Sequence, residues 1–388
     1  MSVMQFKIVN SIAEIGRERW QKVYSGDSPF LRFEFLQAQE KYGCVGEHVG
    51  WIPYHAVIED QSSSELLGIM PLYIKTNSYG ELVFDWAWAN AYERTGREYY
   101  PKLVSAIPYT PVTGERMLIN PSANRESVEK KLIEGVLKDA QAHNFSSIHC
   151  LFPELELCHV FANYKFEKRL GCQFHWHNEG YECFDEFLSK LTSRKRKNIR
   201  KERARVKAQG FQYRVLQGDE IEDELWPVIY EFYKKTFDEK GGYATFTLPF
   251  FKNISECMGE QLLVILAYDD EKPVASAIFY KDSHHLYGRH WGCLDQFDSL
   301  HFEVCYYMGI EYAIKHGIKH FEPGAQGEHK ISRGFLPALT WSSHWIKDPQ
   351  FSLAIEQFIE RERIYMKDYI QELQKHSPFK VIEITREK

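Results

Sequence analysis

Six polar side chains that could bind a substrate or move a proton crowd one glycine-rich stretch of the sequence. They are Glu322, Gln326, Glu328, His329, Lys330 and Arg333, and Pro323, Gly324, Gly327 and Gly334 interrupt regular structure around them. A carboxylate at a strand end can accept a proton from a substrate, and the cations and amides beside it can bind and polarise a polar substrate group. We therefore expect Glu322 to be a general base and Gln326, Lys330 and Arg333 to contact the substrate. A salt-bridged carboxylate in a solvated loop is the structural alternative.

A second polar set lies on residues 286–292, where aromatic and polar residues alternate as in a strand with one wet face. Tyr287, Arg289 and Trp291 are expected to bind substrate. His290 is the second candidate for the general base, and a core histidine is its structural alternative.

The spacing of histidines and cysteines predicts neither a metal site nor a covalent nucleophile. His175 and His177 would share one face of a strand, and His316 and His320 are four residues apart, but no H-E-x-x-H motif accompanies them. The eight cysteines form no C-x-x-C pair, which is typical of reduced thiols, and there is no G-x-S-x-G motif. Since no cysteine or carboxylate lies at a ligand-like interval from these histidines, we expect no metal cofactor.

A strongly basic stretch, residues 193–207, predicts a helix with an anion-binding face. Its cations are Arg194, Lys195, Arg196, Lys197, Arg200, Lys201, Arg203, Arg205 and Lys207, interrupted only by the acidic Glu202. Arg196, Lys197 and Arg200 are the expected anion-binding residues, and the partner would be tRNA, a nucleotide-linked precursor or a phospholipid. The alternative is a solvated helix that connects two domains.

An aromatic and basic stretch, residues 86–100, has no counterpart in the second half of the chain. Its candidate substrate-binding residues are Trp86, Trp88, Tyr92, Arg94, Tyr99 and Tyr100. Unmatched aromatic residues beside arginines favour a cleft wall over additional core. We expect this stretch to face Arg289, Trp291 and Glu322.

The elements that must position these groups follow the same order twice. Three-strand meanders are expected at 55–59, 66–74 and 81–88, and again at 262–267, 274–280 and 286–292. A helix follows each meander, at 126–143 and 302–316, and a strand follows each helix, at 147–152 and 318–322. Further strands are expected at 166–177 and 338–346. The order predicts a duplicated, mixed-sheet α/β fold with a ligand crevice.

Composition is typical of a folded, two-domain protein of the cytoplasm. The chain has 388 residues, 44% of them hydrophobic, and a formal net charge of −6, which argues against general nucleic-acid binding. No signal peptide or membrane span is indicated.

This order of elements resembles the GNAT acyltransferase fold, and two copies resemble the Fem-type aminoacyltransferases that build peptidoglycan cross-bridges. The stretches SPFLRFEFL, FDWAWANAYERTGREYYPKL, SRKRKNIRKER, LYGRHWG and FEPGAQGEHKISRGF are similar to the FemAB-like family of predicted N-acyltransferases, the peptidoglycan biosynthesis or recognition proteins. The resemblance implies acyl-CoA or aminoacyl-tRNA as donor and an amine, such as a small-molecule or cell-wall precursor, as acceptor. The Q/R-x-x-G-x-G/A loop that holds acetyl-CoA in GNAT enzymes is not found, which puts CoA use in doubt.

We therefore expect a first GNAT-like domain at 1–178 and a second, carrying the basic helix, at 179–347. Residues 348–388 would form a helix (351–375) and a strand (380–384) that brace the first domain. The expected function is N-acyl or aminoacyl transfer to an amine. The alternatives are a non-catalytic binding protein for an anionic precursor on the same fold and a tRNA-binding accessory module that uses only the basic helix.

Overall fold

The computed structural model describes residues 4–239, 241–325 and 327–380, so Gln326 and all but the first residue of the expected strand 380–384 lie outside the described residues. The chain forms two compact units. Unit 1 comprises residues 1–171, 245–253 and 339–367, and unit 2 comprises residues 172–244, 254–338 and 368–388. Each unit therefore combines segments that are distant in the sequence. The expected domains, with limits at 178 and 347, were instead continuous stretches of the chain.

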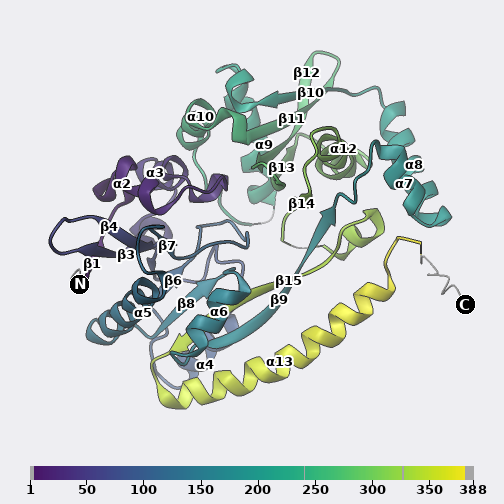
Figure 1. Cartoon of the computed structure of the whole chain (residues 1–388). Helices are drawn as coiled ribbons and strands as arrows, with labels where there is room; N and C mark the ends of the chain where they lie inside the picture. The colour runs from purple at the N-terminus through teal and green to yellow at the C-terminus, as the bar shows by residue number, and fades with distance from the viewer. Residues whose placement is uncertain (1–3, 240, 326, 381–388) are drawn as a thin grey trace, which may run out of the picture. The chain divides into compact units, whose positions relative to one another are not determined.

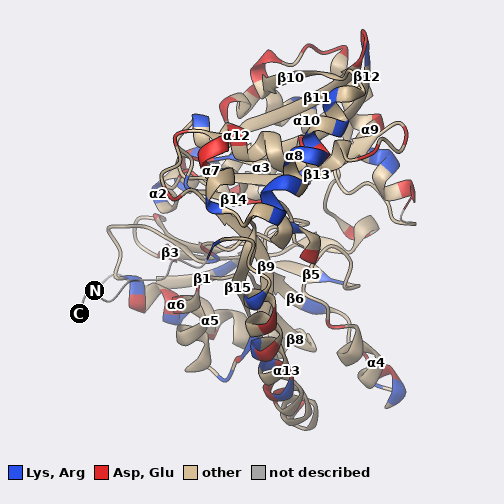
Figure 2. Cartoon of the chain, turned by 90° about the vertical axis from the view of Figure 1, so that its right-hand side faces the viewer, with Lys and Arg blue, Asp and Glu red and all other residues tan. Residues whose placement is uncertain are grey.

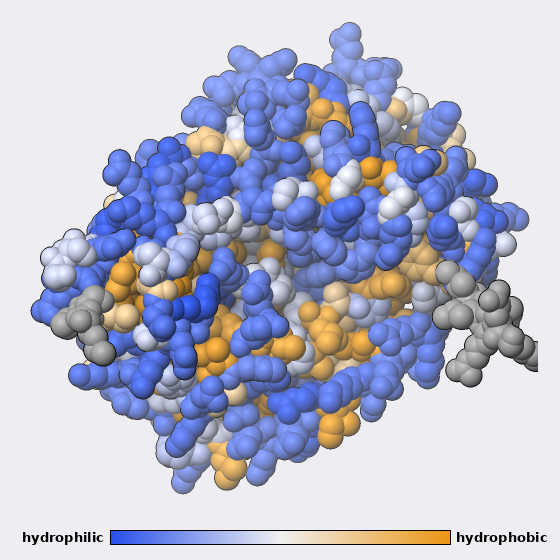
Figure 3. Space-filling view, in the orientation of Figure 1, coloured by the Kyte–Doolittle hydropathy of each residue, from blue (hydrophilic) through white to orange (hydrophobic). Residues whose placement is uncertain are grey.

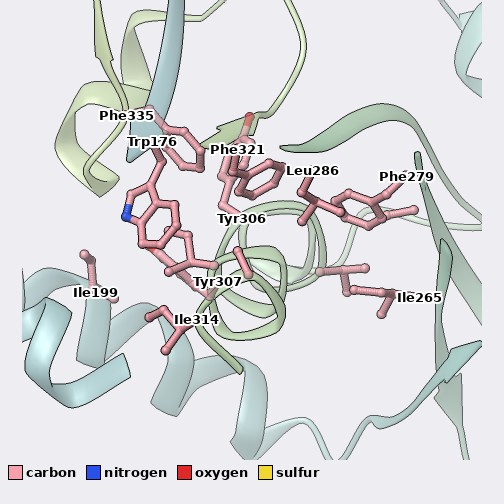
Figure 4. Packing of buried hydrophobic residues seen from close by; sticks show 14 of the residues in the cluster. Trp176, Ile199, Ile265, Phe279, Leu286, Tyr306, Tyr307, Ile314, Phe321 and Phe335 are labelled. Carbon is pink, nitrogen blue, oxygen red and sulfur yellow. The ribbon is translucent and has the colours of Figure 1, made fainter. Parts of the chain in front are cut away.

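Unit 2 is built on one sheet with the strand order β10-β11-β12-β13-β14-β9. The strands are β10 (Gln212–Gln217), β11 (Leu262–Asp269), β12 (Lys272–Lys281), β13 (His285–Cys293), β14 (His320–Glu322) and the end of β9 (Glu167–His177). The helices α7 (Phe184–Lys190), α8 (Ser193–Ala208), α9 (Leu225–Glu239), α11 (Leu300–Phe302) and α12 (Met308–Lys315) belong to this unit, and a π-helix, Glu303–Tyr307, joins α11 to α12. Trp176, Phe279 and Phe321 of the sheet pack around this helical segment (Figure 4).

Unit 1 has two sheets. One has the order β15-β8-β6-β5-β2, formed by β15 (Leu336–Ile346), β8 (Ser147–Leu151), β6 (Lys102–Ser105), β5 (Tyr73–Lys75) and β2 (Trp51–Pro53). The other is antiparallel, β1 (Met4–Val9), β3 (His55–Asp60), β4 (Leu66–Met70) and β7 (Leu118–Ile119). Leu132 and Val136 of α5 (Arg125–Ala142) belong to one buried cluster with Ile58 of β3 and Ile148 of β8, which joins both sheets.

Shorter helices complete unit 1: α1 (Ile12–Ile15), α2 (Arg17–Val23), α3 (Phe33–Lys41), α4 (Trp86–Arg94) and α6 (Leu155–Ala162). Helix α10 (Leu248–Cys257) and the long α13 (Pro349–Lys375) contribute residues to both units (Figure 1). In unit 1, Ile355 and Ile359 of α13 cluster with Trp88, Tyr92 and Tyr99.

The two units repeat one order of strand directions. In unit 2, β9 is antiparallel to β14, β14 is parallel to β13, and β13 is antiparallel to β12. In unit 1, β15 is antiparallel to β8, β8 is parallel to β6, and β6 is antiparallel to β5. The predicted mixed α/β fold with two GNAT-like copies is confirmed.

The last strand of each copy is exchanged. β9 follows the first copy in sequence but pairs with β14 of unit 2, through His177 opposite His320. β15 follows the second copy but pairs with β8 of unit 1, through Ser342–Ile346. The expected domain limits at 178 and 347 kept each strand with the copy that precedes it, because strands adjacent in sequence are usually neighbours in space.

One predicted strand is wrong. Residues 81–85 form a loop and residues 86–88 are the first turn of α4, whereas the strand that pairs with β5 is β6. In this stretch Glu81 and Asp85 are 4% and 2% exposed and Trp86 is 43% exposed, which is the reverse of a strand with one wet face. Strand β10 and helix α9 were not predicted from the sequence.

Within the part of the chain that the structure describes, no helix combines the length and apolarity needed to cross a bilayer. On the face seen in Figure 3, hydrophilic residues predominate.

Candidate functional site

Glu322 ends β14 and is 7% exposed. Parallel pairing places it opposite Tyr287 of β13, and Gly324 turns the chain away from the sheet with φ 95°. A parallel-strand end beside a glycine turn is a usual position for a functional side chain in α/β sheets. This position is the one that the sequence predicted for the candidate base.

Arg289 is the partner of Glu322. Its Nη2 lies 3.3 Å from Oε2 of Glu322, and the two side chains are 5% and 9% exposed. Arg289 lies at a β-bulge, because the pairing of β13 with β12 shifts between Ile278 and Phe279. Burial raises the pKa of the Glu322 carboxyl, and the Arg289 charge offsets part of the rise.

Lys330 adds a second cation beside this pair. It lies on the short helix Glu328–Arg333, is 3% exposed, and donates from Nζ to the Gly324 carbonyl at 2.7 Å. Burial lowers the pKa of Lys330 to about 7, and the positive charge of Arg289 adds to the lowering. These three residues are here called the triad: Glu322 pairs with Arg289, and Lys330 lies at the turn after Glu322, within electrostatic range of Arg289.

Around this triad, the same sheet face carries more polar groups than the sequence suggested. The Tyr287 hydroxyl donates to Asp282 at 2.8 Å, and Asp282 also contacts the His285 ring at 3.0 Å. The Nδ1 atoms of His177 and His320 are 2.9 Å apart. Asp282 and His285 were not among the site residues predicted from the sequence. The turn that contains Asp282 and Ser283 is nevertheless recognisable, because Asp and Ser are typical turn residues.

His290 has a different environment. Its ring meets Tyr233 of α9 edge to face, with centroids 4.8 Å apart. Burial, assisted by Arg289, lowers the pKa of His290 to about 3, so the imidazole is neutral and weakly basic. Among the two candidate bases, Glu322 therefore has the more suitable proton affinity.

Two other candidates in unit 2 make structural contacts. Arg333 forms an ion pair with Glu202 of α8 at 3.0 Å, and its guanidinium carbon lies 3.5 Å from the centre of the Phe302 ring. The Trp291 ring meets His301, with centroids 5.3 Å apart.

The aromatic candidates of unit 1 divide into buried and exposed residues. Trp88, Tyr92 and Tyr99 are each 3% exposed, whereas Trp86 is 43% exposed. The Tyr100 hydroxyl lies 2.6 Å from the Ser78 hydroxyl, and Arg94 is exposed at the end of α4.

The basic helix is confirmed as α8 and has two unlike halves. Arg200, Arg203 and Arg205 pair with Asp185, Glu303 and Asp298 at 2.9, 2.7 and 2.8 Å. Arg196 and Lys197, in contrast, have no ion pair with any described residue. Figure 2 shows this concentration of Lys and Arg along α8.

No group of three or more His, Cys, Asp or Glu side chains within residues 4–239, 241–325 and 327–380 is arranged to hold a metal ion.

Comparison with protein families gives one match, which covers residues 11–381. The matching model is FemAB-like, described as peptidoglycan biosynthesis/recognition. A search of curated proteins found no match to the sequence.

Solved structures with the same fold include FemX, at 12% identity and a TM-score of 0.52, covering 90% of this chain and 100% of that chain. The C-terminal domain (DUF2156) of a putative lysylphosphatidylglycerol synthetase from Agrobacterium fabrum matches at 11% identity and a TM-score of 0.52, covering 89% of this chain and 96% of that one. At such identities the likeness concerns the fold alone.

Proposed function

Because the chain belongs to the FemAB-like family, whose model covers residues 11–381, we propose that it transfers an acyl or aminoacyl group to the amine of an acceptor. The acceptor is a cell-wall precursor, as the family description, peptidoglycan biosynthesis/recognition, suggests. The supporting observation is the buried triad of Glu322, Arg289 and Lys330 at the end of β14.

In the proposed reaction, Glu322 accepts the proton that the attacking amine loses. A C–N bond forms, the bond between the acyl carbon and the oxygen or sulfur of the donor breaks, and the leaving group takes up a proton. A carboxyl whose pKa burial has raised is better matched to this task than an ordinary glutamate.

Arg289 and Lys330 would stabilise the negative charge that develops on the carbonyl oxygen. Cations held in a site with little water stabilise such a charge more strongly than cations in bulk solvent do. They are already in position, so no solvent has to reorient during the reaction. Because burial lowers the pKa of Lys330 to about 7, the charge of this amine depends on pH near neutrality.

The alternative is a binding protein for an anionic precursor. It is favoured by one observation: Glu322 is only 7% exposed and already pairs with Arg289 at 3.3 Å. A substrate amine would meet a carboxylate that is already engaged through Oε2 with Arg289. Arg289 could bind an anionic precursor even if Glu322 never accepted a proton.

The Glu322→Gln variant separates the two proposals, because it keeps the size of the side chain and removes the base. Transfer is expected to fall by about a hundredfold or more, as for other general bases, while precursor binding persists. The measurement is single-turnover transfer beside calorimetric binding of the same precursor. Glu328→Gln, at the start of the adjacent short helix, is the control. Unchanged transfer by Glu322→Gln would assign the base elsewhere.

A further inference from the structure

In unit 1, the segment from Ser78 to Trp86 has polar side chains inside and apolar side chains outside. Ser78, Glu81 and Asp85 are 6%, 4% and 2% exposed. Tyr79, Leu82, Phe84 and Trp86, here called the apolar tip, are 52%, 36%, 52% and 43% exposed. Burying charge and exposing apolar surface both cost free energy in water. A loop that faced only water would have the reverse arrangement.

The inner side of this segment is fixed by a buried ionic network. Lys102, which is fully buried, pairs with Asp85, and its Nζ donates to Glu81 at 2.9 Å and to Ser78 at 3.2 Å. The Tyr99 hydroxyl also donates to Asp85, at 2.6 Å. These contacts hold the polar side chains inward, so the apolar side chains between them must point outward.

A second attachment lies at Phe84. Arg169 donates to the Phe84 carbonyl at 2.9 Å and binds both carboxylate oxygens of Glu362, at 2.7 and 2.8 Å. The rings of Tyr79 and Trp86 meet edge to face, with centroids 6.0 Å apart. The apolar tip is therefore presented by a segment that is held at several points.

The segment that carries the apolar tip has no exposed formal charge of its own, and Arg169 and Glu362, which lie beside Phe84, pair with each other. From Thr76 to Tyr92 the only acidic or basic side chains are Glu81 and Asp85, and both are buried. Figure 2 shows that α4, which continues the segment, projects beyond β6 and β8 of its unit. Phosphate-bearing polymers would require exposed cations, and protein interfaces usually have a polar rim.

We propose that the apolar tip inserts into the interfacial layer of an uncharged lipid bilayer and docks the chain peripherally on a membrane. Trp and Tyr rings favour the headgroup level of a bilayer, and Phe and Leu favour the hydrocarbon just below it. A few inserted side chains attach a protein to a membrane reversibly, whereas a spanning helix inserts almost irreversibly. The docking requires neither Glu322 nor Arg289, so it goes beyond the proposed transfer reaction and is independent of it.

Co-sedimentation of the full chain with sucrose-loaded vesicles of phosphatidylcholine alone tests this docking. Wild-type protein is expected to sediment with the vesicles, and added salt should not release it because no charge is involved. Phe84→Ser and Trp86→Ser are each expected to weaken partitioning roughly tenfold. Tyr365→Ser, which alters a residue of α13 that is 67% exposed, should have no effect. Near-UV circular dichroism would verify that the variants keep the fold.

Three results would overturn the proposal. The first is absence of the wild-type chain from the phosphatidylcholine pellet. The second is binding that requires phosphatidylglycerol and disappears in salt, because that dependence would assign the contact to cations. The third is a dimer, seen by light scattering, that Phe84→Ser dissociates, because a second copy would then cover the apolar tip. Glu322→Gln should retain vesicle binding, so a failure of the transfer proposal leaves this one standing.

Discussion

At the scale of single residues, the buried pair of Glu322 and Arg289 is the contact on which the proposed chemistry depends. The sequence predicted Glu322 at a strand end, and the structure has it there, on β14. Its pairing with Arg289 could not be predicted, because it requires both the parallel register of β13 with β14 and the bulge that shifts β13 against β12. Neither feature has a local sequence signal.

The burial of Lys330 has a consequence for stability. Because the pKa of Lys330 is lowered from 10.5 to about 7, the unfolded chain binds more protons than the folded chain between these values. The free energy of unfolding therefore rises with pH in that window. Lys330→Met removes this penalty and should stabilise the fold by roughly 2 to 4 kcal/mol below pH 7, with the gain shrinking toward pH 10. Urea unfolding at several pH values would measure it.

Lys197→Met, which alters an exposed lysine of α8, is the matched control and should show no such pH dependence. A destabilised Lys330→Met variant at pH 6 would contradict the prediction.

Removal of Lys102 should have the opposite effect on stability. Burial raises the pKa of Glu81 to about 7, whereas Lys102 holds the pKa of Asp85 below its usual range against the effect of burial. Lys102→Met leaves both carboxyls buried without that cation and should cost roughly 3 to 5 kcal/mol at pH 8. The loss should diminish as the pH falls, because protonation neutralises the carboxyls. Thermal unfolding at pH 5 and pH 8 would test this, with Lys22→Met as the exposed control.

At the scale of elements, α8 combines two roles along one helix. Its C-terminal half is attached to unit 2 through Arg203 and Arg205, and its N-terminal half presents Arg196 and Lys197 without acidic partners among the described residues. Cations near a helix N-terminus oppose the helix dipole, so their presence there has a small cost in stability. An anionic ligand would offset that cost.

The charge-reversed variant Arg196→Glu/Lys197→Glu should therefore weaken binding of an anionic precursor steeply at low salt and much less at high salt. Lys207→Glu, at the other end of α8, is the control. Titration of the same precursor at two ionic strengths is the measurement. If binding is undiminished and independent of salt, α8 is a solvated connector.

Elements with a regular hydrophobic pattern were predictable, and α4 was not. The periodicity of α5 and α12 and the apolar runs of β11 and β12 gave those elements within a few residues. The stretch 81–88 was misassigned because its buried residues are charged and its exposed residues are aromatic. Glu81 and Asp85 can be buried because Lys102 of β6 pairs with them. Lys102 lies about twenty residues away in the sequence, so the local pattern of residues 81–88 gives no sign of this pairing.

At the scale of the whole molecule, the exchange of β9 and β15 makes each unit depend on both halves of the sequence. A fragment of residues 1–178 lacks the β15 residues that pair with β8, and residues 179–388 lack the β9 residues that pair with β14. Each fragment alone should fail to fold, and co-expression should restore both. Solubility and NMR dispersion of the fragments, separate and together, would measure this. A well-dispersed spectrum from residues 1–178 alone would contradict it.

The strand exchange also dictates when each unit can be finished during synthesis. A ribosome that makes the chain from its N-terminus releases most of unit 1 before it has made residues 339–367, which that unit requires. The edge of β8 must therefore remain without β15 while roughly two hundred residues emerge, a delay of ten seconds or more at about 5 to 20 residues per second. An edge strand left unpaired for so long is a natural target for chaperones, and for aggregation when they are absent.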